Sequence, residues 1–242
     1  MASSKEYWEN YWKEENRTGD QFLFSKLLDR QKITDINSYF ELGCAPGSIM
    51  AHFAHKYNCK VSGVDIVDKS IVTDYLNKEQ VNDYEVYEDD LYKIQTKEKY
   101  DFVASYGLIE HYMNLDKIIE VHKSLVADNG HLLITIPNMR FINKLIHQHY
   151  SKEELEMHNC DIMNLKILKS LILDDEFQEV YANFCYTSIF QANSNSQKFK
   201  EHPRLKNIYT VMNFLMKYTK TDNIPNRFAS PYIAVLAKKK TL

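Results

Sequence analysis

Short apolar runs separated by amphipathic segments constrain the fold of this chain most. The run "HLLITIP" at 131–137 is rich in β-branched residues and lacks polar alternation, which is typical of a strand buried on both faces of a sheet. Segments of helical period alternate with such runs, and this alternation predicts a parallel sheet covered by helices on both faces. The predicted strands are 38–42, 60–64, 85–87, 100–105, 131–136, 178–184 and 232–237, and the predicted helices are 48–57, 69–77, 115–125 and 165–173. We therefore predict an α/β, Rossmann-like doubly wound fold with seven mostly parallel strands, the last one antiparallel.

Length and composition predict one domain over residues 1–242. A chain of 242 residues can bury one sizeable core, and no low-complexity linker divides it. An amphipathic segment at 5–28 predicts a cap helix within residues 1–30. Two polar, aromatic-rich insertions, 139–163 and 191–229, interrupt the α/β alternation. Because ligand contacts on such folds lie mostly on connections, we expect both insertions to form lids over an acceptor pocket.

Charge and cysteine usage narrow the class of protein further. A formal charge of −3 gives no general attraction to nucleic acid, so we expect no nucleic-acid partner. Residues 1–15 are too charged for a signal peptide, and no run reaches the roughly 18 apolar residues of a membrane span. The four cysteines form no CxxC pair and are expected to be free thiols without zinc. We expect a cytoplasmic protein. Whether it forms a homodimer is left open.

The stretch "YFELGCAPGS" at 39–48 reads as a strand that ends in a tight loop. Gly43 and Gly47 allow a sharp turn and a close approach to a ligand. In a doubly wound sheet, ligands bind beyond the carboxyl ends of the strands, where the first strand-to-helix turn lies. The third glycine of the dinucleotide fingerprint G-x-G-x-x-G is missing, which disfavours a nicotinamide dinucleotide.

With Glu41 before its two glycines, the stretch resembles motif I of class I S-adenosylmethionine-dependent methyltransferases, with Ala45 in place of the middle glycine. The resemblance extends over most of the chain and implies S-adenosylmethionine as cofactor and S-adenosylhomocysteine as product. It implies that Asp65, at the end of "VSGVDIV", accepts hydrogen bonds from the ribose hydroxyls. Helix capping by Asp65 is the alternative. The cofactor contacts that we predict are Tyr7, Tyr11, Glu41, Gly43, Ala45, Gly47, Asp65, Ile66, Asp89, Asp90, Leu91, Ser105 and Tyr106.

Two of these groups rest on further parts of the resemblance. Asp89 and Asp90 follow the third strand, where the family places an acidic residue against adenine, although a solvated turn would look the same. In "YWENYWKEE", the tyrosines and the tryptophans each lie four residues apart, so each pair shares a helix face. An aromatic pair most often packs into a core, but the resemblance implies a first helix that folds over the cofactor, whose sulfonium is attracted to aromatic rings. The predicted contacts are Tyr7 and Tyr11.

The segment "FVASYGLIEHY" at 102–112 resembles the family's fourth motif, which implies that its loop borders the transferred methyl group. An O-methyl transfer needs an acceptor hydroxyl to lose its proton, and histidine has a pKa suited to that task. We therefore predict His111 as the general base. The alternative, that His111 only packs beside the cofactor, stays open.

The first insertion resembles, less specifically, small-molecule methyltransferases of polysaccharide and other glycan pathways. The predicted acceptor contacts are Asn138, Arg140, His158 and Asn159, which suit hydroxyls or a phosphate, and a solvated lid face is the alternative. His147 and His149 would point to different sides of a helix, and no carboxylates are seen to converge, so we predict no metal site.

The predicted function is metal-independent O-methylation of a small polar acceptor, such as a capsular or nucleotide-linked sugar or a phosphorylated precursor. RNA methylation is one alternative, because "CAPG" also occurs in RNA ribose methyltransferases, but "SYGLIEH" lacks their lysine and aspartate pattern. A non-catalytic regulatory protein that binds S-adenosylmethionine is the other alternative.

Overall fold

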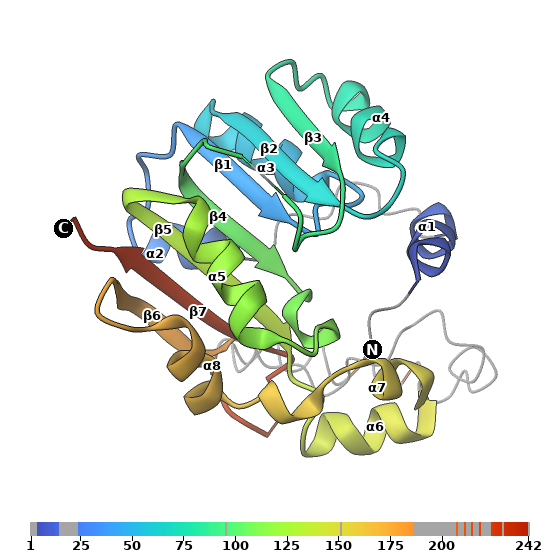
Figure 1. Ribbon diagram of the computed structural model, residues 1–242. Helices are drawn as coiled ribbons and strands as arrows, with labels where there is room; N and C mark the ends of the chain where they lie inside the picture. Colours follow the sequence, from blue (N-terminus) through green and yellow to red (C-terminus); the bar gives the residue numbers. More distant parts are fainter. Residues whose placement is uncertain are drawn as a thin grey trace.

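A seven-stranded sheet with the order β3-β2-β1-β4-β5-β7-β6 forms the centre of the molecule (Figure 1). The computed structural model describes residues 4–14, 24–94, 96–150, 152–185, 207, 211, 214, 218, 224–228 and 230–241. The strands are β1 (Ser38–Leu42), β2 (Lys60–Asp65), β3 (Tyr84–Glu88), β4 (Tyr100–Tyr106), β5 (Val126–Pro137), β6 (Phe177–Cys185) and β7 (Tyr232–Lys239). The first five pair in parallel, and β7 runs antiparallel to both β5 and β6. The predicted doubly wound fold with an antiparallel last strand is confirmed.

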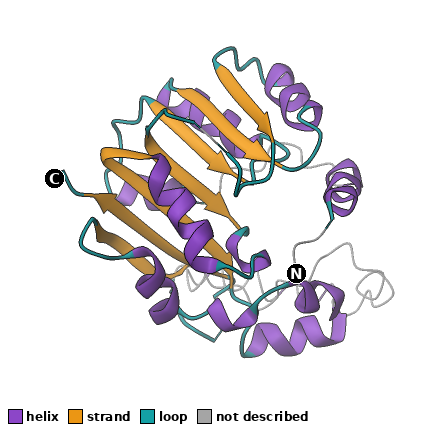
Figure 2. Cartoon of the chain, in the orientation of Figure 1, coloured by secondary structure: helices purple, strands orange, loops and turns teal. Residues whose placement is uncertain are grey.

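Helices cover both faces of the sheet (Figure 2). They are α1 (Lys5–Glu14), α2 (Ser25–Arg30), α3 (Ser48–Tyr57), α4 (Ser70–Lys78), α5 (Leu115–Leu125), α6 (Ile142–Tyr150), α7 (Lys152–Met157) and α8 (Leu165–Ile172), with 3₁₀ turns η1 (Ile109–His111) and η2 (Cys160–Ile162). Leu28, Phe53 and Leu76 from α2, α3 and α4 pack into one core. Ile118 of α5 and Leu168 of α8 pack into a second core on the opposite face. Burial on both faces explains why the central strands lack polar alternation.

Most element boundaries match the sequence prediction within two residues, and β5 is the exception. It begins at Val126, five residues before the predicted start. After Val126, the added residues "ADNG" have low strand propensity, and Asn129 adopts a left-handed conformation with φ of 62°. Pairing of Val126 with Tyr100 of β4 nevertheless starts the strand there, across an irregular register. Tertiary pairing therefore overrides local preference.

The amphipathic segment predicted at 5–28 contains two separate helices, α1 and α2, and residues 15–23 lie outside the described part. The first insertion, 139–163, forms α6, α7 and η2. The second insertion, 191–229, lies mostly outside the described residues, so the prediction that the insertions act as lids stays a prediction. The four cysteines are unpaired, as predicted. Among the described helices, none has the length and apolarity to cross a bilayer.

The reversal of strand order lies between β1 and β4, which are neighbours in the sheet. Helix α1 stands apart from the sheet, on the side toward which the strand arrows point (Figure 1). The carboxyl ends of β1 and β4 are therefore the place where a ligand of this fold is expected.

Candidate active site

The loop between β1 and α3 is shaped by two glycines in the left-handed region. Gly43 has φ of 74°, and a Cβ added there would come within 2.8 Å of Leu108 Cδ1. Gly47, with φ of 100°, is the N-cap residue of α3. Any larger residue would strain both positions, so the two glycines allow the sharp turn that the predicted motif I requires.

Asp65 ends β2 beside this loop. One carboxylate oxygen, Oδ2, accepts a hydrogen bond from the Ala45 amide at 3.0 Å, and Oδ1 accepts one from the Val67 amide at 3.3 Å. Burial raises the pKa of Asp65, while these amide donors oppose the rise. The N-cap residue of α4 is Lys69, so the alternative that Asp65 caps this helix is not observed.

A cavity opens between this loop, the end of β4 and α1. Seven of the predicted cofactor contacts line it: Glu41, Gly43, Ala45, Asp65, Ile66, Leu91 and Tyr106. Gly107, in the fourth-motif loop that is predicted to border the methyl group, lines it as well, and so do Leu108 and Tyr112, which the sequence prediction did not include as contacts. The carboxyl groups of buried Glu41 and half-buried Asp65 line the cavity together with aromatic side chains. This donor and acceptor set fits the ribose, adenine and sulfonium groups of S-adenosylmethionine.

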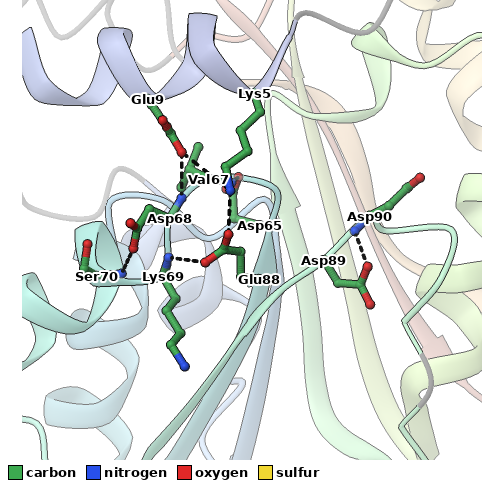
Figure 3. A network of polar contacts seen from close by, with 10 residues as sticks. All are labelled: Lys5, Glu9, Asp65, Val67, Asp68, Lys69, Ser70, Glu88, Asp89 and Asp90. Carbon is green, nitrogen blue, oxygen red and sulfur yellow. Dashed lines mark hydrogen bonds and ion pairs between the residues drawn. The ribbon is translucent and has the colours of Figure 1, made fainter.

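Six predicted cofactor contacts are not part of this lining: Tyr7, Tyr11, Gly47, Asp89, Asp90 and Ser105. Ser105 is fully buried, and its hydroxyl is 2.9 Å from His122 Nε2 in α5, on the far side of β4. Asp89 and Asp90 form a turn in which Asp89 Oδ1 accepts from the Asp90 amide at 2.7 Å (Figure 3). The cavity does not include this pair, which corresponds to the solvated-turn alternative. Strand ends alone do not reveal which side chain turns inward.

Trp8 and Trp12, rather than the predicted Tyr7 and Tyr11, place their rings on the cavity. Tyr7 is 37% exposed and stacks on Tyr11 at a centroid distance of 6.4 Å. The Trp8 ring stands edge-on to the His111 imidazole at 5.2 Å. The four-residue spacing defines two aromatic faces of α1, and only the docking of the helix decides which face is covered.

Polar contacts join α1 to the ends of β2 and β3 (Figure 3). Lys5 Nζ lies 2.5 Å from Glu88 Oε1, and Glu9 Oε1 accepts a hydrogen bond from the Asp68 amide at 3.2 Å. Glu88 Oε2 also accepts from the Lys69 amide at 3.2 Å. These contacts hold the tryptophan face of α1 over the cavity.

His111 lies in η1, lines the cavity and is buried. Its Nδ1 is 3.3 Å from the Met157 carbonyl oxygen, so Nδ1–H donates and Nε2 is left as an acceptor in the neutral ring. Burial, with a smaller contribution from His158, lowers the pKa of His111 to about 4. The imidazole is therefore neutral at neutral pH, with one nitrogen able to accept a proton.

Glu110 is the residue that sequence reasoning missed. Its side chain is 1% exposed, and neither carboxyl oxygen has a hydrogen-bond partner among the described residues. Burial raises the pKa of Glu110 to about 8. Oε1 would lie 3.3 Å from a Cβ added at Gly107, a residue of the cavity wall. A carboxyl group thus sits directly behind the cavity, next to His111.

The end of the first insertion packs against this pair. The His158 ring is 4.4 Å from the His111 ring, and the Asn159 amide donates to the Glu110 carbonyl oxygen at 2.8 Å. The side-chain nitrogen and oxygen atoms of Glu110, His111 and His158 lie within 4.8 Å of one another. In the described part of the chain, this is the one cluster of three such side chains that is close enough to hold a metal ion. The predicted acceptor contacts His158 and Asn159 are therefore beside the candidate base.

The other two predicted acceptor contacts lie away from the cavity. Asn138 is fully buried, and its Nδ2 donates to the carbonyl oxygens of Ser230, at 2.7 Å, and Arg227, at 3.2 Å. This amide positions the connection before β7. Arg140 lines a separate hollow with Arg227.

The model of the family described as "Methyltransferase domain" matches residues 11–180. Pavine N-methyltransferase of Thalictrum flavum subsp. glaucum is 30% identical over 130 residues, which cover 51% of this chain and 36% of that protein. (S)-Coclaurine N-methyltransferase of Papaver somniferum is 24% identical over 152 residues, or 60% and 42% of the two chains. The chain thus spans less than half the length of these curated relatives.

Solved structures of low sequence identity share the fold. Coclaurine N-methyltransferase bound to N-methylheliamine and S-adenosylhomocysteine aligns with a TM-score of 0.58 at 18% identity, covering 93% of this chain and 75% of that one. The N-methyltransferase NodS of Bradyrhizobium japonicum WM9, in complex with S-adenosylhomocysteine, aligns with a TM-score of 0.56 at 11% identity, covering 96% and 98%. The chain therefore belongs to the methyltransferase domain family and is a class I S-adenosylmethionine-dependent methyltransferase in fold and cofactor.

Proposed function

We propose that this protein transfers the methyl group of S-adenosylmethionine to the nitrogen of a small amine. The observation that carries the proposal is His111 in the cavity wall with the buried side chain of Glu110 next to it, behind that wall. The relatives named above are N-methyltransferases, which supports a nitrogen acceptor.

An aliphatic amine has a pKa near 10.4 and arrives protonated, so its nitrogen must lose a proton before it can attack. A neutral His111 with Nε2 as acceptor can receive that proton. Where Glu110, within 4.8 Å, has already released its own proton to solvent, its carboxylate stabilises the imidazolium. The pair then carries the one proton that the amine has lost.

The chain also orients the reactants. When bound, the cofactor supplies an electrophilic methyl group on a sulfonium. Trp8 and Tyr112 line the same cavity and attract cationic groups to their ring faces. Asp65 and the Gly43 turn would fix the nucleoside end, so the rings and His111 define where the acceptor nitrogen approaches. Alignment of this kind can contribute roughly 7 to 11 kcal/mol to the lowering of a barrier.

O-methylation of a sugar hydroxyl is the second candidate, and His111 favours it too, because a neutral imidazole can accept a hydroxyl proton during attack. A polysaccharide pathway, a cytoplasmic location, the absence of a nucleic-acid partner and a homodimer stay predictions. The two candidates differ in pH dependence. Methylation of an amine accelerates as pH rises toward the amine pKa, whereas methylation of a sugar hydroxyl has no such rise.

Methyl-labelled S-adenosylmethionine, incubated with matched pairs of small amines and alcohols, tests the proposal. Labelled N-methyl products, formed slowly by His111→Asn and normally by His149→Asn, are the expected result, since His149 is exposed on α6. Methylated products from the alcohols alone would show that the acceptor is a hydroxyl group and not an amine. Cofactor binding without any product would instead support the non-catalytic regulatory alternative.

A further inference from the structure

A second hollow lies at the carboxyl edge of the sheet, and its lining shares no residue with the cofactor cavity. It measures about 500 Å³, within the size range of small-molecule sites. Four cationic and two aromatic side chains line it: Arg140, Lys166, Lys169, Arg227, Phe141 and Phe184. Such a combination suits a ligand that carries both negative charge and an apolar part.

Among the described residues, most of the positive charge of this hollow has no ion-pair partner. Within the described part of the chain, Lys169 alone of the four cations has an ion-pair partner, Glu179 Oε2 at 2.5 Å. Arg140, Lys166 and Arg227 converge from three different segments: the β5–α6 connection, the first turn of α8 and the segment 224–228. Like charges that are held together repel one another, and a bound anion would relieve that repulsion.

Local contacts hold the two arginines in place. Both guanidinium carbons lie beside the Phe141 ring, at 5.5 Å for Arg140 and 5.7 Å for Arg227. Arg227 also lies 4.6 Å from the Phe228 ring, and its carbonyl oxygen accepts the hydrogen bond from buried Asn138. Cation–π attraction and this hydrogen bond thus place two planar, bidentate donors at one site before a ligand arrives.

The beginning of α8 adds to the positive electrostatic potential in the hollow. Asn164 caps the helix by accepting a hydrogen bond from the Lys166 amide at 2.9 Å, and both residues line the hollow. The positive end of the helix dipole therefore faces the same space as the arginines.

The hollow and the methyl-transfer site lie at the same edge of the sheet. Strands β5 and β6 both run antiparallel to β7, so their carboxyl ends share the edge at which β4 ends. Met163 lines the hollow, and Asn159, four residues earlier, contacts Glu110. Four residues span at most about 14 Å.

We propose that the hollow binds an anionic group, a phosphate or a carboxylate, at the far end of the acceptor molecule. This inference rests on the proposed function, because the acceptor nitrogen must reach the cofactor cavity from the same molecule. The arginines pair with the anion, and Phe141 and Phe184 contact the arm that joins it to the amine. The acceptor class is then an amine that carries a phosphate or a carboxylate at its far end.

Binding is tested on the full chain saturated with S-adenosylhomocysteine, so that the cofactor cavity is occupied. Inorganic phosphate and acetate are titrated separately and followed by amide chemical shifts. We expect shifts in residues around Phe141 and Lys166, and at least tenfold weaker binding by Arg227→Gln. The control Lys97→Gln removes one exposed positive charge before β4, at the opposite edge of the sheet, and should bind as the native chain does. If both variants weakened anion binding equally, the effect would depend only on net charge, and the proposal would be overturned.

Turnover separates this inference from the function on which it rests. The substrates are ω-aminoalkyl phosphates, ω-amino carboxylates and ω-amino alcohols of matched lengths. We expect lower KM for the anionic series, with Arg227→Gln raising KM about tenfold for that series and leaving the alcohols unchanged. Equal KM for all three series, unaffected by Arg227→Gln, overturns the anion site while amine methylation stands. Phosphate binding that depends on Arg227, without methylation of any amine, overturns the amine acceptor and keeps the anion site.

Discussion

Replacing Glu110 with glutamine should stabilise the folded protein more at pH 7 than at pH 5. In the native fold, burial raises the pKa of this carboxyl to about 8 from an ordinary value of 4.5. The unfolded chain therefore releases the proton at neutral pH, while the folded chain keeps it. A raised pKa of an acid gives stability that is present below the unfolded value and is lost as pH rises toward the folded value.

The expected size follows from the two pKa values. Between pH 5 and pH 7 the native protein loses about 2.5 kcal/mol of unfolding free energy through Glu110, because each pKa unit corresponds to roughly 1.36 kcal/mol. Glutamine has the same shape and does not titrate. The packing difference between the two side chains is the same at both pH values and cancels in the comparison.

The assay is urea unfolding of the native protein and the Glu110→Gln variant, both without cofactor, at pH 5 and pH 7. His111 titrates in the same range in both proteins, so its contribution also largely cancels. Turnover should fall in the variant, because glutamine cannot ionise beside a protonated His111. A difference in unfolding free energy that does not change with pH would refute the buried, protonated Glu110 on which this reasoning depends.

Three further outcomes are expected. Asp65→Ala should weaken S-adenosylmethionine binding by about 1.5 to 3 kcal/mol, the range for a hydrogen bond to a charged group, and calorimetry that showed unchanged affinity would remove Asp65 from the ribose site. His111→Asn should keep cofactor affinity and lower turnover about 10²-fold, and the native rate should show no inflection from this imidazole above pH 5, because burial lowers its pKa to about 4. A separate step in the rate with its midpoint near pH 6.5, on top of the rise toward the amine pKa, would contradict that burial. Trp8→Phe should lower cofactor affinity more than Tyr7→Phe in the same titration, since Trp8 lines the cavity, and equal effects would argue against the observed face of α1.

Local sequence determined much of this protein. Alternating periods and β-branched runs indicated the strands and helices, because a parallel sheet covered on both faces requires those patterns. Gly43 and Gly47 marked the ligand loop, since their backbone angles and the space beside Gly43 exclude a larger side chain. Asp65 was predictable as well, because it ends a strand at the known binding edge of this fold.

Only the tertiary structure decided which side chains meet. The tyrosine and tryptophan pairs of α1 have the same spacing. Because the helix docks through Lys5 and Glu88, the tryptophans line the cavity. Glu110 is an ordinary acidic residue in the sequence, and its burial behind Gly107 raises its pKa. Arg140 and Arg227, far apart along the chain, come together at Phe141. Periodicity reports the local backbone, whereas burial and charge depend on long-range packing, which no local pattern encodes.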